Sequence, residues 1–383
     1  MPKLIFIGAA LMVGLSCGIA SQSNRPTTTT NVGTDQAGVI VATGNISVPR
    51  FEHTATLLRN GKVLIAGGMA QNGVFEPTAE IYDPSTGHFT PAGRLIWQRA
   101  WGSTAALLPS GKVLIAGGSS GQCGTACNLA TAEIYDPDSG SFIRTGNMNE
   151  ARAVLISAVL RNGDVLLAGG NEPSESSPFA TAELYHPASA SFSPTGSMRA
   201  SRGVLAAVTL KSGKVLVIGQ NNTNGIIEQA TAEIYDPATG TFTATGTMKV
   251  PRTKLGAALM ADGRVLVVGG QIGGPFGERL SSSEVYDPAT GVFSPGPEMN
   301  SKRFKLPHAV VPLANGRVLV AGGAERPEVF DPAKSVFMAV GGAKLDGYSF
   351  SSATVLASGE VLIVGGYARP QDGAVNHAWI YRP

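Results

Sequence analysis

The chain has 383 residues, a net charge of +2, 49 glycines and three cysteines. So small a net charge gives no electrostatic reason to expect nucleic acid or an anionic membrane surface as a partner. The glycine content suits a chain rich in turns, and no window beyond the N-terminus shows a sustained helical period. We therefore expect an all-β protein.

The N-terminus has the pattern of an export signal. Lys3 precedes an apolar run over residues 4–16, which is too short to span a bilayer as a stable helix. Two cleavage sites fit: one before Cys17, as in bacterial lipoproteins, and one after Ala20, which gives a signal peptide over residues 1–20. We expect an exported protein, either periplasmic, secreted or anchored to the outer envelope by a lipid on Cys17. Residues 21–37 are polar and predict a flexible tether.

The rest of the chain repeats. The block Gly-Lys-Val-Leu-Ile-Ala-Gly-Gly and its near-copies end at Gly68, Gly118, Gly170, Gln220, Gly270, Gly323 and Gly366. A period of about 50 residues predicts an architecture whose units cannot each bury their own apolar face and must pack against their neighbours.

One repeat, residues 50–93, predicts four short strands, here called a to d. Asn60-Gly61 separates two apolar runs and is a strong signal for a β-hairpin turn. A second hairpin spans residues 78–93, where Pro84 ends strand c because proline cannot pair in a central strand. Four antiparallel strands repeated radially form the blade of a β-propeller.

The last repeat ends at Pro383 after three strands. Residues 38–44 are similar in pattern to residues 240–246, which belong to a strand d. We therefore expect the N-terminal strand to complete the seventh blade, because a closed ring leaves no exposed sheet edge. The predicted fold is a seven-bladed β-propeller over residues 38–383, closed by the N-terminal strand.

Gly-Gly after four apolar residues, followed by a spaced Tyr and a second aromatic residue, resembles the kelch motif. The aromatic pairs are Tyr82–Phe89, Tyr135–Phe142, Tyr185–Phe192, Tyr235–Phe242, Tyr286–Phe293 and, in weaker form, Phe330–Phe337. The resemblance covers residues 38–383 and extends to the central propeller of galactose oxidase. The copper site of that family needs two Tyr, two His and a cross-linked Cys, which no matching residues supply here. We therefore expect no metal and no cofactor.

Cys123 and Cys127 lie together in the b–c loop of the second blade. Their spacing in an exported chain predicts a local disulfide that fixes the shape of this loop. A zinc site is the weaker interpretation, because it would need further His or Cys ligands nearby.

The two faces of the predicted ring differ. The a–b and c–d turns are tight, whereas the b–c loops are long, except in blade six, where residues 324–327 would leave a notch in the rim. Loops on a rigid scaffold commonly carry binding sites. We therefore place the candidate site on the face of the b–c loops and d–a connections, at the mouth of the central channel.

Two charged positions recur in the repeat. Arginines stand at the d–a junction (Arg50, Arg99, Arg152, Arg202, Arg252) and glutamates on strand c (Glu80, Glu133, Glu183, Glu233, Glu284, Glu328). In blade six Lys305 stands in register with the arginines and Arg303 just before it; blade seven has Tyr348 and Trp379 instead of the pair. One interpretation is a set of structural Arg–Glu pairs. The other is an arginine-lined mouth for anionic ligands, which the resemblance supports, because kelch domains that recognise acidic peptides use arginines near this junction.

Divergent blades favour a specific site between blades six, seven and one. We expect a ligand to contact Arg50, His53, Arg303, Lys305, His308 and Tyr348, with Trp97 and Trp101 as further aromatic surface. The predicted function is a monomeric binding module for a protein or an anionic glycan or peptide. The alternative, implied by the resemblance alone, is a periplasmic enzyme of the sugar mutarotase type that uses Arg, Glu and His at the channel mouth.

Overall fold

The computed structural model describes residues 37–121, 127–171, 178–203, 206–219, 230–272, 277–369 and 373–383. The expected signal peptide, and the expected tether up to residue 36, lie outside these ranges, as does Cys17. Within them, no helix is long and apolar enough to cross a membrane.

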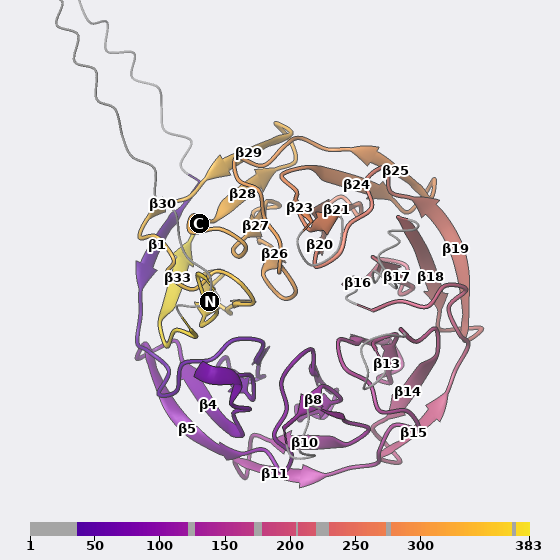
Figure 1. Cartoon of the computed structure of the whole chain (residues 1–383), viewed down its shortest axis with the longest axis vertical. Coiled ribbons are helices and arrows are strands. Elements are labelled where there is room, and N and C mark those ends of the chain that lie inside the picture. The colour runs from indigo at the N-terminus through magenta and orange to yellow at the C-terminus, as the bar shows by residue number, and fades with distance from the viewer. Residues whose placement is uncertain are drawn as a thin grey trace, which may run out of the picture. The chain divides into compact units, whose positions relative to one another are not determined.

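Seven antiparallel sheets follow one another around a ring, with strand a nearest the centre and strand d at the rim (Figure 1). Their strands, in the order a to d, are these: β2 Thr54–Leu57, β3 Val63–Ala66, β4 Thr78–Asp83, β5 His88–Arg94; β6 Thr104–Leu107, β7 Val113–Ala116, β10 Ala132–Asp136, β11 Ser141–Arg144; β12 Ile156–Val159, β13 Val165–Ala168, β14 Ala182–His186, β15 Ser191–Pro194; β16 Ala206–Thr209, β17 Val215–Ile218, β18 Thr231–Asp236, β19 Thr241–Thr247; β20 Gly256–Leu259, β21 Val265–Val268, β24 Ser283–Asp287, β25 Val292–Pro295; β26 Val310–Pro312, β27 Val318–Val320, β28 Glu328–Asp331, β29 Val336–Ala339; and β31 Ser352–Val355, β32 Val361–Val364, β33 Ala378–Arg382, β1 Val39–Ala42. The predicted seven-bladed β-propeller is confirmed.

The core of the molecule lies between blades rather than within them. Strand b is buried at every position in all seven blades, since its residues pack against a neighbouring blade on either side. One apolar cluster, for example, joins Leu166 of blade three to Val215 and Tyr235 of blade four. Burial between repeats explains why four consecutive apolar residues recur in each unit.

The aromatic pairs fasten strand c to strand d and to the preceding blade. The two rings of each pair lie 4.7–5.0 Å apart, centroid to centroid. In four blades the Tyr hydroxyl also hydrogen-bonds a Thr in or just after strand d of the preceding blade, for example Tyr82 to Thr43 at 2.9 Å. Blade six has Phe330 in place of the tyrosine, and blade five, which precedes it, has Gly296 in place of the threonine. Neither partner of this hydrogen bond is therefore present between blades five and six.

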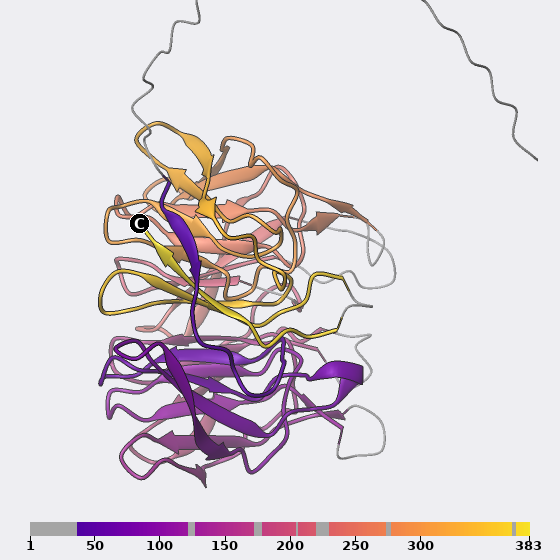
Figure 2. The same cartoon turned by 90° about the vertical axis from the view of Figure 1, so that its left-hand side faces the viewer.

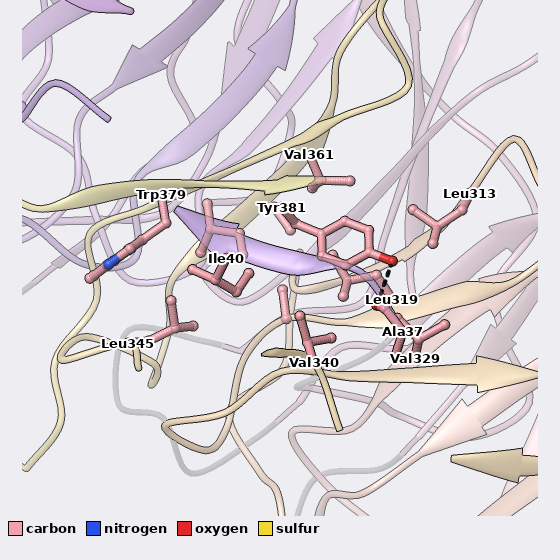
Figure 3. Close-up of a cluster of buried hydrophobic side chains, with 13 residues drawn as sticks. Ala37, Ile40, Leu313, Leu319, Val329, Val340, Leu345, Val361, Trp379 and Tyr381 are labelled. Atoms are coloured by element: carbon pink, nitrogen blue, oxygen red, sulfur yellow. Dashed lines mark hydrogen bonds between the residues drawn. The ribbon is translucent and has the colours of Figure 1, made fainter. Parts of the chain in front are cut away.

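The two ends of the propeller meet in blade seven, as predicted. β1 pairs antiparallel with β33, with Val39 opposite Arg382 and Ala42 opposite Trp379. The short strand β30 (Gly341–Gly342) adds to the free side of β1 in parallel. Figure 3 shows Ile40 between Trp379 and Tyr381, and the Tyr381 hydroxyl donates a hydrogen bond to the Ala37 carbonyl at 2.9 Å.

The two faces of the ring differ as expected. The 3₁₀ helix η1 (Gln71–Gly73) and the hairpin of β22 (Gln271–Ile272) with β23 (Glu278–Arg279) extend from the b–c loop face, whereas the opposite face carries tight turns (Figure 2). A second small hairpin joins β8 (Ser119–Ser120) and β9 (Cys127–Asn128). Cys127 takes part in a disulfide. Cys123 lies outside the described residues, so the pairing of these two cysteines stays a prediction.

Candidate binding site at the channel mouth

The recurring arginines and glutamates form six buried ion pairs. Each pair joins one guanidinium nitrogen and one carboxylate oxygen at 2.7–3.2 Å, and every arginine is at most 2% exposed: Arg50–Glu80, Arg99–Glu133, Arg152–Glu183, Arg202–Glu233, Arg252–Glu284 and Arg303–Glu328. This arrangement confirms the structural interpretation of the repeat.

Arg99 shows what each pair does. Its Nε and Nη2 donate to Glu133 Oε1 at 3.0 and 2.8 Å, and its Nη1 donates to the carbonyls of Gly117 and Thr131 at 2.8 and 3.0 Å. Glu133 Oε2 in turn accepts from the Ile96 amide at 2.7 Å. The pair therefore ties the incoming d–a connection to the ends of strands b and c. Burial lowers the pKa of the Arg99 guanidinium while Glu133 raises it, and the group stays charged.

This result corrects two parts of the sequence interpretation. Arg50 and Arg303 are fully buried in their pairs, so their position does not offer them to a ligand in the channel. In blade six, Arg303 and not Lys305 makes the arginine contacts, to Gly322 and Glu328. The register of Lys305 was wrong because blade six carries a different spacing between this junction and strand b.

Blade seven replaces the ion pair with apolar packing. Trp379 is 4% exposed and belongs to the core cluster between blades six and seven, as Figure 3 shows. Tyr348 packs against the same cluster. Tyr348 does not line the channel, so the structure does not bring it together with the other candidate residues.

Six residues near the channel mouth share an unusual backbone. Two residues after five of the buried arginines, and after Tyr348 in blade seven, the chain has φ between 53° and 59°; we call these residues the mouth ring: Glu52, Trp101, Val154, Lys254, Lys305 and Phe350. The equivalent Val204 of blade four lies outside the described residues. L-amino acids with side chains adopt this left-handed conformation at a cost of about 1 kcal/mol or more each.

Backbone hydrogen bonds link neighbouring members of the mouth ring. The Leu306 amide donates to the Lys254 carbonyl at 3.3 Å, the Phe350 amide to the Lys305 carbonyl at 3.2 Å, and the Glu52 amide to the Phe350 carbonyl at 3.2 Å. These bonds connect blades five, six, seven and one in turn. The side chains of this half of the ring are therefore presented at fixed positions.

The mouth ring opens into a cavity of about 990 Å³ along the channel. All six of its residues line the cavity, together with small side chains of the strands a, such as Ala55, Ala105 and Ala257. A volume of this size admits a sugar ring or a short peptide segment. Trp101 is 40% exposed at this surface.

His53 and His308 also line the cavity, at the same repeat position in blades one and six. His53 is buried, and its Nε2 hydrogen-bonds Ser352 Oγ at 2.8 Å. Burial, followed by the charges of Arg50 and His308, lowers the pKa of His53 to about 3. His308 is exposed to the channel, and its enclosure by the ring lowers its pKa too. Both imidazoles are therefore neutral near pH 7.

Three cations gather on the blade five and six side of the mouth. The Lys305 ammonium lies 5.1 Å from the Phe304 ring centroid, and the Arg279 guanidinium lies 4.1 Å from the same ring. Burial lowers the pKa of Lys305, and the charges of Lys254 and Arg279 lower it further. In the described part of the chain, neither Lys254 nor Arg279 forms an ion pair, so their charge is available to a ligand.

Comparison with known proteins agrees with this architecture. The sequence model of the Kelch motif family matches residues 252–300, which span blade five. This chain is a kelch-repeat β-propeller. Among solved structures, it is similar to a fungal alcohol oxidase of the AA5 family in complex with copper, at 17% identity and a TM-score of 0.70, over 91% of this chain and 77% of that one. No curated protein matches the sequence.

The copper of that oxidase does not transfer to this propeller. At 17% identity the similarity concerns the fold alone. Across the described ranges, no three His, Cys, Asp or Glu side chains are grouped so that they could hold a metal ion. The His53 imidazole forms a hydrogen bond with Ser352. The Tyr367 hydroxyl, which also lines the cavity, accepts a hydrogen bond from Lys305. The donor set at this mouth does not fit a copper centre.

Of the residues that the sequence singles out, His53, Trp101, Lys305 and His308 line the cavity, whereas Glu52, Lys254, Phe350, Tyr367 and the nearby Arg279 were not expected there. A signal for the mouth ring was present in the repeat. Five residue types occupy this position in the seven blades, namely Glu, Trp, Val, Lys and Phe, so the repeat does not fix the side chain there. A variable position at a fixed place on a repeated scaffold indicates the surface where binding is specified.

Proposed function

We propose that this kelch propeller is an interaction module that binds a carboxylate-bearing ligand, an acidic glycan or an acidic peptide segment, at the mouth of its channel. The observation that supports the proposal best is a group of three cations: Lys305 and Arg279 lie over the Phe304 ring, and the charge of Lys254 acts on Lys305. The mouth ring offers one carboxylate, Glu52, against these three positive charges, and the remaining excess of positive charge at a concave surface favours an anion.

The mouth also offers contacts for the uncharged part of such a ligand. Trp101 of blade two and Phe350 of blade seven present aromatic surface on either side of blade one, and Gln271 and Asn171 line the cavity with amides. Sugar rings and peptide planes both stack on aromatic side chains. The six buried arginines contribute rigidity instead of ligand contacts, because both terminal nitrogens of each guanidinium donate to carbonyl or carboxylate oxygens inside the protein.

Binding of oligogalacturonate and of a glutamate-rich peptide to the full chain tests the proposal, measured by calorimetry at low and physiological salt. We expect Lys254→Ala and Arg279→Ala each to weaken binding about tenfold at low salt, with a smaller effect at physiological salt, where the screening length is about 8 Å. Lys214→Ala is the matched control, because Lys214 pairs with Asp236 on the opposite face. Equal affinity of all three variants, or no binding of either probe, would contradict the proposal.

Export of the chain remains part of this proposal and rests on the N-terminal sequence alone. Mass spectrometry of the mature N-terminus distinguishes the two cleavage sites: lipid on Cys17 identifies a lipoprotein, and a free Ser21 identifies a soluble exported protein.

A further inference from the structure

Lys305 differs in its surroundings from the exposed lysines of the propeller. Its Nζ lies 4.9–5.1 Å from the ring centroids of Phe304, Phe350 and Tyr367, and it donates a hydrogen bond to the Tyr367 hydroxyl. The backbone at Lys305 is held by its left-handed conformation and by the Phe350 amide. The amine is therefore fixed in a three-sided aromatic box at the wall of the 990 Å³ cavity.

Opposing effects act on the charge of this amine. The aromatic faces favour the ammonium ion, and the carboxylate of Glu52 favours it as well. Burial disfavours the charged form, as do the neighbouring charges of Lys254 and Arg279, and the pKa of Lys305 falls to about 8. A substantial fraction of Lys305 is then a neutral amine at mildly alkaline pH, and a neutral amine is a nucleophile.

Five lysines at the surface form ion pairs with carboxylates. Lys62, Lys112 and Lys214 each pair with a strand c aspartate at 2.8–2.9 Å, and Lys302 and Lys344 pair with Glu278 and Glu325. The pKa of Lys112 is raised by its partner Asp136. No such ion pair involves Lys305 in the described ranges. Lysines that carry out covalent chemistry are characteristically desolvated or placed beside another cation, and Lys305 meets both conditions.

Tyr367 supplies a proton donor at the same place. Burial, and then the charge of Glu52, raises the pKa of its phenol to about 12, so it stays protonated. Its hydroxyl is within hydrogen-bond reach of Lys305 Nζ, and both groups line the cavity. A nucleophilic amine and a neutral phenol that share one wall can act on the two ends of the same carbonyl group.

We propose that Lys305 forms a reversible imine with a small aldehyde or 2-oxo acid that enters the channel, with Lys254 and Arg279 holding a carboxylate when the ligand carries one. The neutral Nζ adds to the carbonyl carbon, and the nitrogen passes one of its two protons to the carbonyl oxygen to give a neutral carbinolamine. The C–O bond then breaks, the oxygen leaves as water with a proton from the Tyr367 phenol, and the nitrogen loses a proton to solvent, which returns it to the tyrosine. The balance is one amine and one carbonyl in, one imine and one water out. Only the carboxylate contact rests on the proposed function; the imine itself does not.

Reductive trapping of the full chain tests this inference. The protein is incubated with glyoxylate and sodium cyanoborohydride, which converts an imine to a stable secondary amine, and modified lysines are mapped by mass spectrometry. We expect Lys305 to be labelled at least about tenfold faster than Lys302 and Lys344 at pH 7.5, because more of it is neutral there. Its labelling rate should level off above about pH 8.

Two variants and a second probe make the outcomes distinct. Lys305→Arg keeps the charge and should abolish the fast label, whereas Tyr367→Phe keeps the ring and should slow labelling several-fold. Labelling of Lys305 at the rate of the surface lysines, or preferential labelling of Lys254, would overturn the inference. Propanal carries no carboxylate: fast labelling of Lys305 by both probes, without preference for glyoxylate, would uphold the imine and contradict anion binding at the mouth.

Discussion

Two exposed turn residues, Ala190 and Ser335, hold a left-handed backbone, with φ of 52° and 54°. Glycines take this place in the c–d turns of four other blades: Gly87, Gly140, Gly240 and Gly291. Because a Cβ crowds the carbonyl in this conformation, we expect Ala190→Gly to raise the free energy of unfolding by about 0.5–1 kcal/mol, after the larger entropy of the unfolded glycine chain is deducted. The converse change Gly140→Ala, with no atom within 4 Å of the added Cβ, should lower it by a similar amount. Urea denaturation with unchanged m-values measures both, and a less stable Ala190→Gly protein would contradict the strain.

The mouth ring shares this conformation in six blades, yet none of these described residues is glycine. In four c–d turns a glycine avoids the cost of the left-handed backbone, but no described residue of the mouth ring does so. We infer that the side chains of the mouth ring have a function that outweighs this cost.

At the scale of elements, each buried Arg–Glu pair joins a d–a connection to strands b and c of the same blade. We expect Arg99→Met to cost about 3–5 kcal/mol, since it leaves the Glu133 carboxylate and two carbonyls buried without their donors. The double variant Arg99→Met/Glu133→Leu should recover a large part of that loss, because blade seven already fills the equivalent space with Tyr348 and Trp379. Lys112→Ala, which breaks an exposed pair with Asp136, is the control and should cost less than about 1 kcal/mol. Thermal and chemical unfolding of the three proteins gives the comparison; a double variant as unstable as Arg99→Met would mean that the pair has a role that apolar packing cannot replace.

The same elements show how far the sequence could predict the structure. The apolar run of strand b, the Asn60-Gly61 turn and the Tyr–Phe spacing are local signals repeated seven times or nearly so, and they determine strands, turns and blade count. The orientation of a d–a connection is not local: whether an arginine reaches Glu or the channel depends on where the chain turns. The chain makes that turn at the residue of the mouth ring, two positions after the arginine. The residues of the mouth ring share no single residue type, so the sequence does not predict the turn. For this reason the sequence alone does not show that Arg303, and not Lys305, pairs with Glu328. It also does not show that the arginines are withdrawn from the channel.

At the scale of the whole molecule, β1 joins the beginning of the propeller to its end by strand pairing, because it forms the outer partner of β33. A chain that starts at Asn45 would lack β1 and would leave the outer side of β33 unpaired, with Trp379 and Tyr381 beside an open core. We expect this variant to unfold at lower temperature than the chain that starts at Ala37 and to associate as its concentration rises, because the free edge of β33 can pair with another chain. A point variant separates packing from pairing. Ile40→Ala keeps the backbone of β1 but empties a site that is 1% exposed, and should cost about 2–5 kcal/mol. Val39→Ala, at a side chain 37% exposed on the same strand, should cost less than about 1 kcal/mol. Calorimetry measures the melting temperatures of these variants, and light scattering measures the association of the truncated chain. A truncated chain that stays monomeric with an unchanged melting temperature would show that contacts between blades, without the closing strand, suffice to hold the ring.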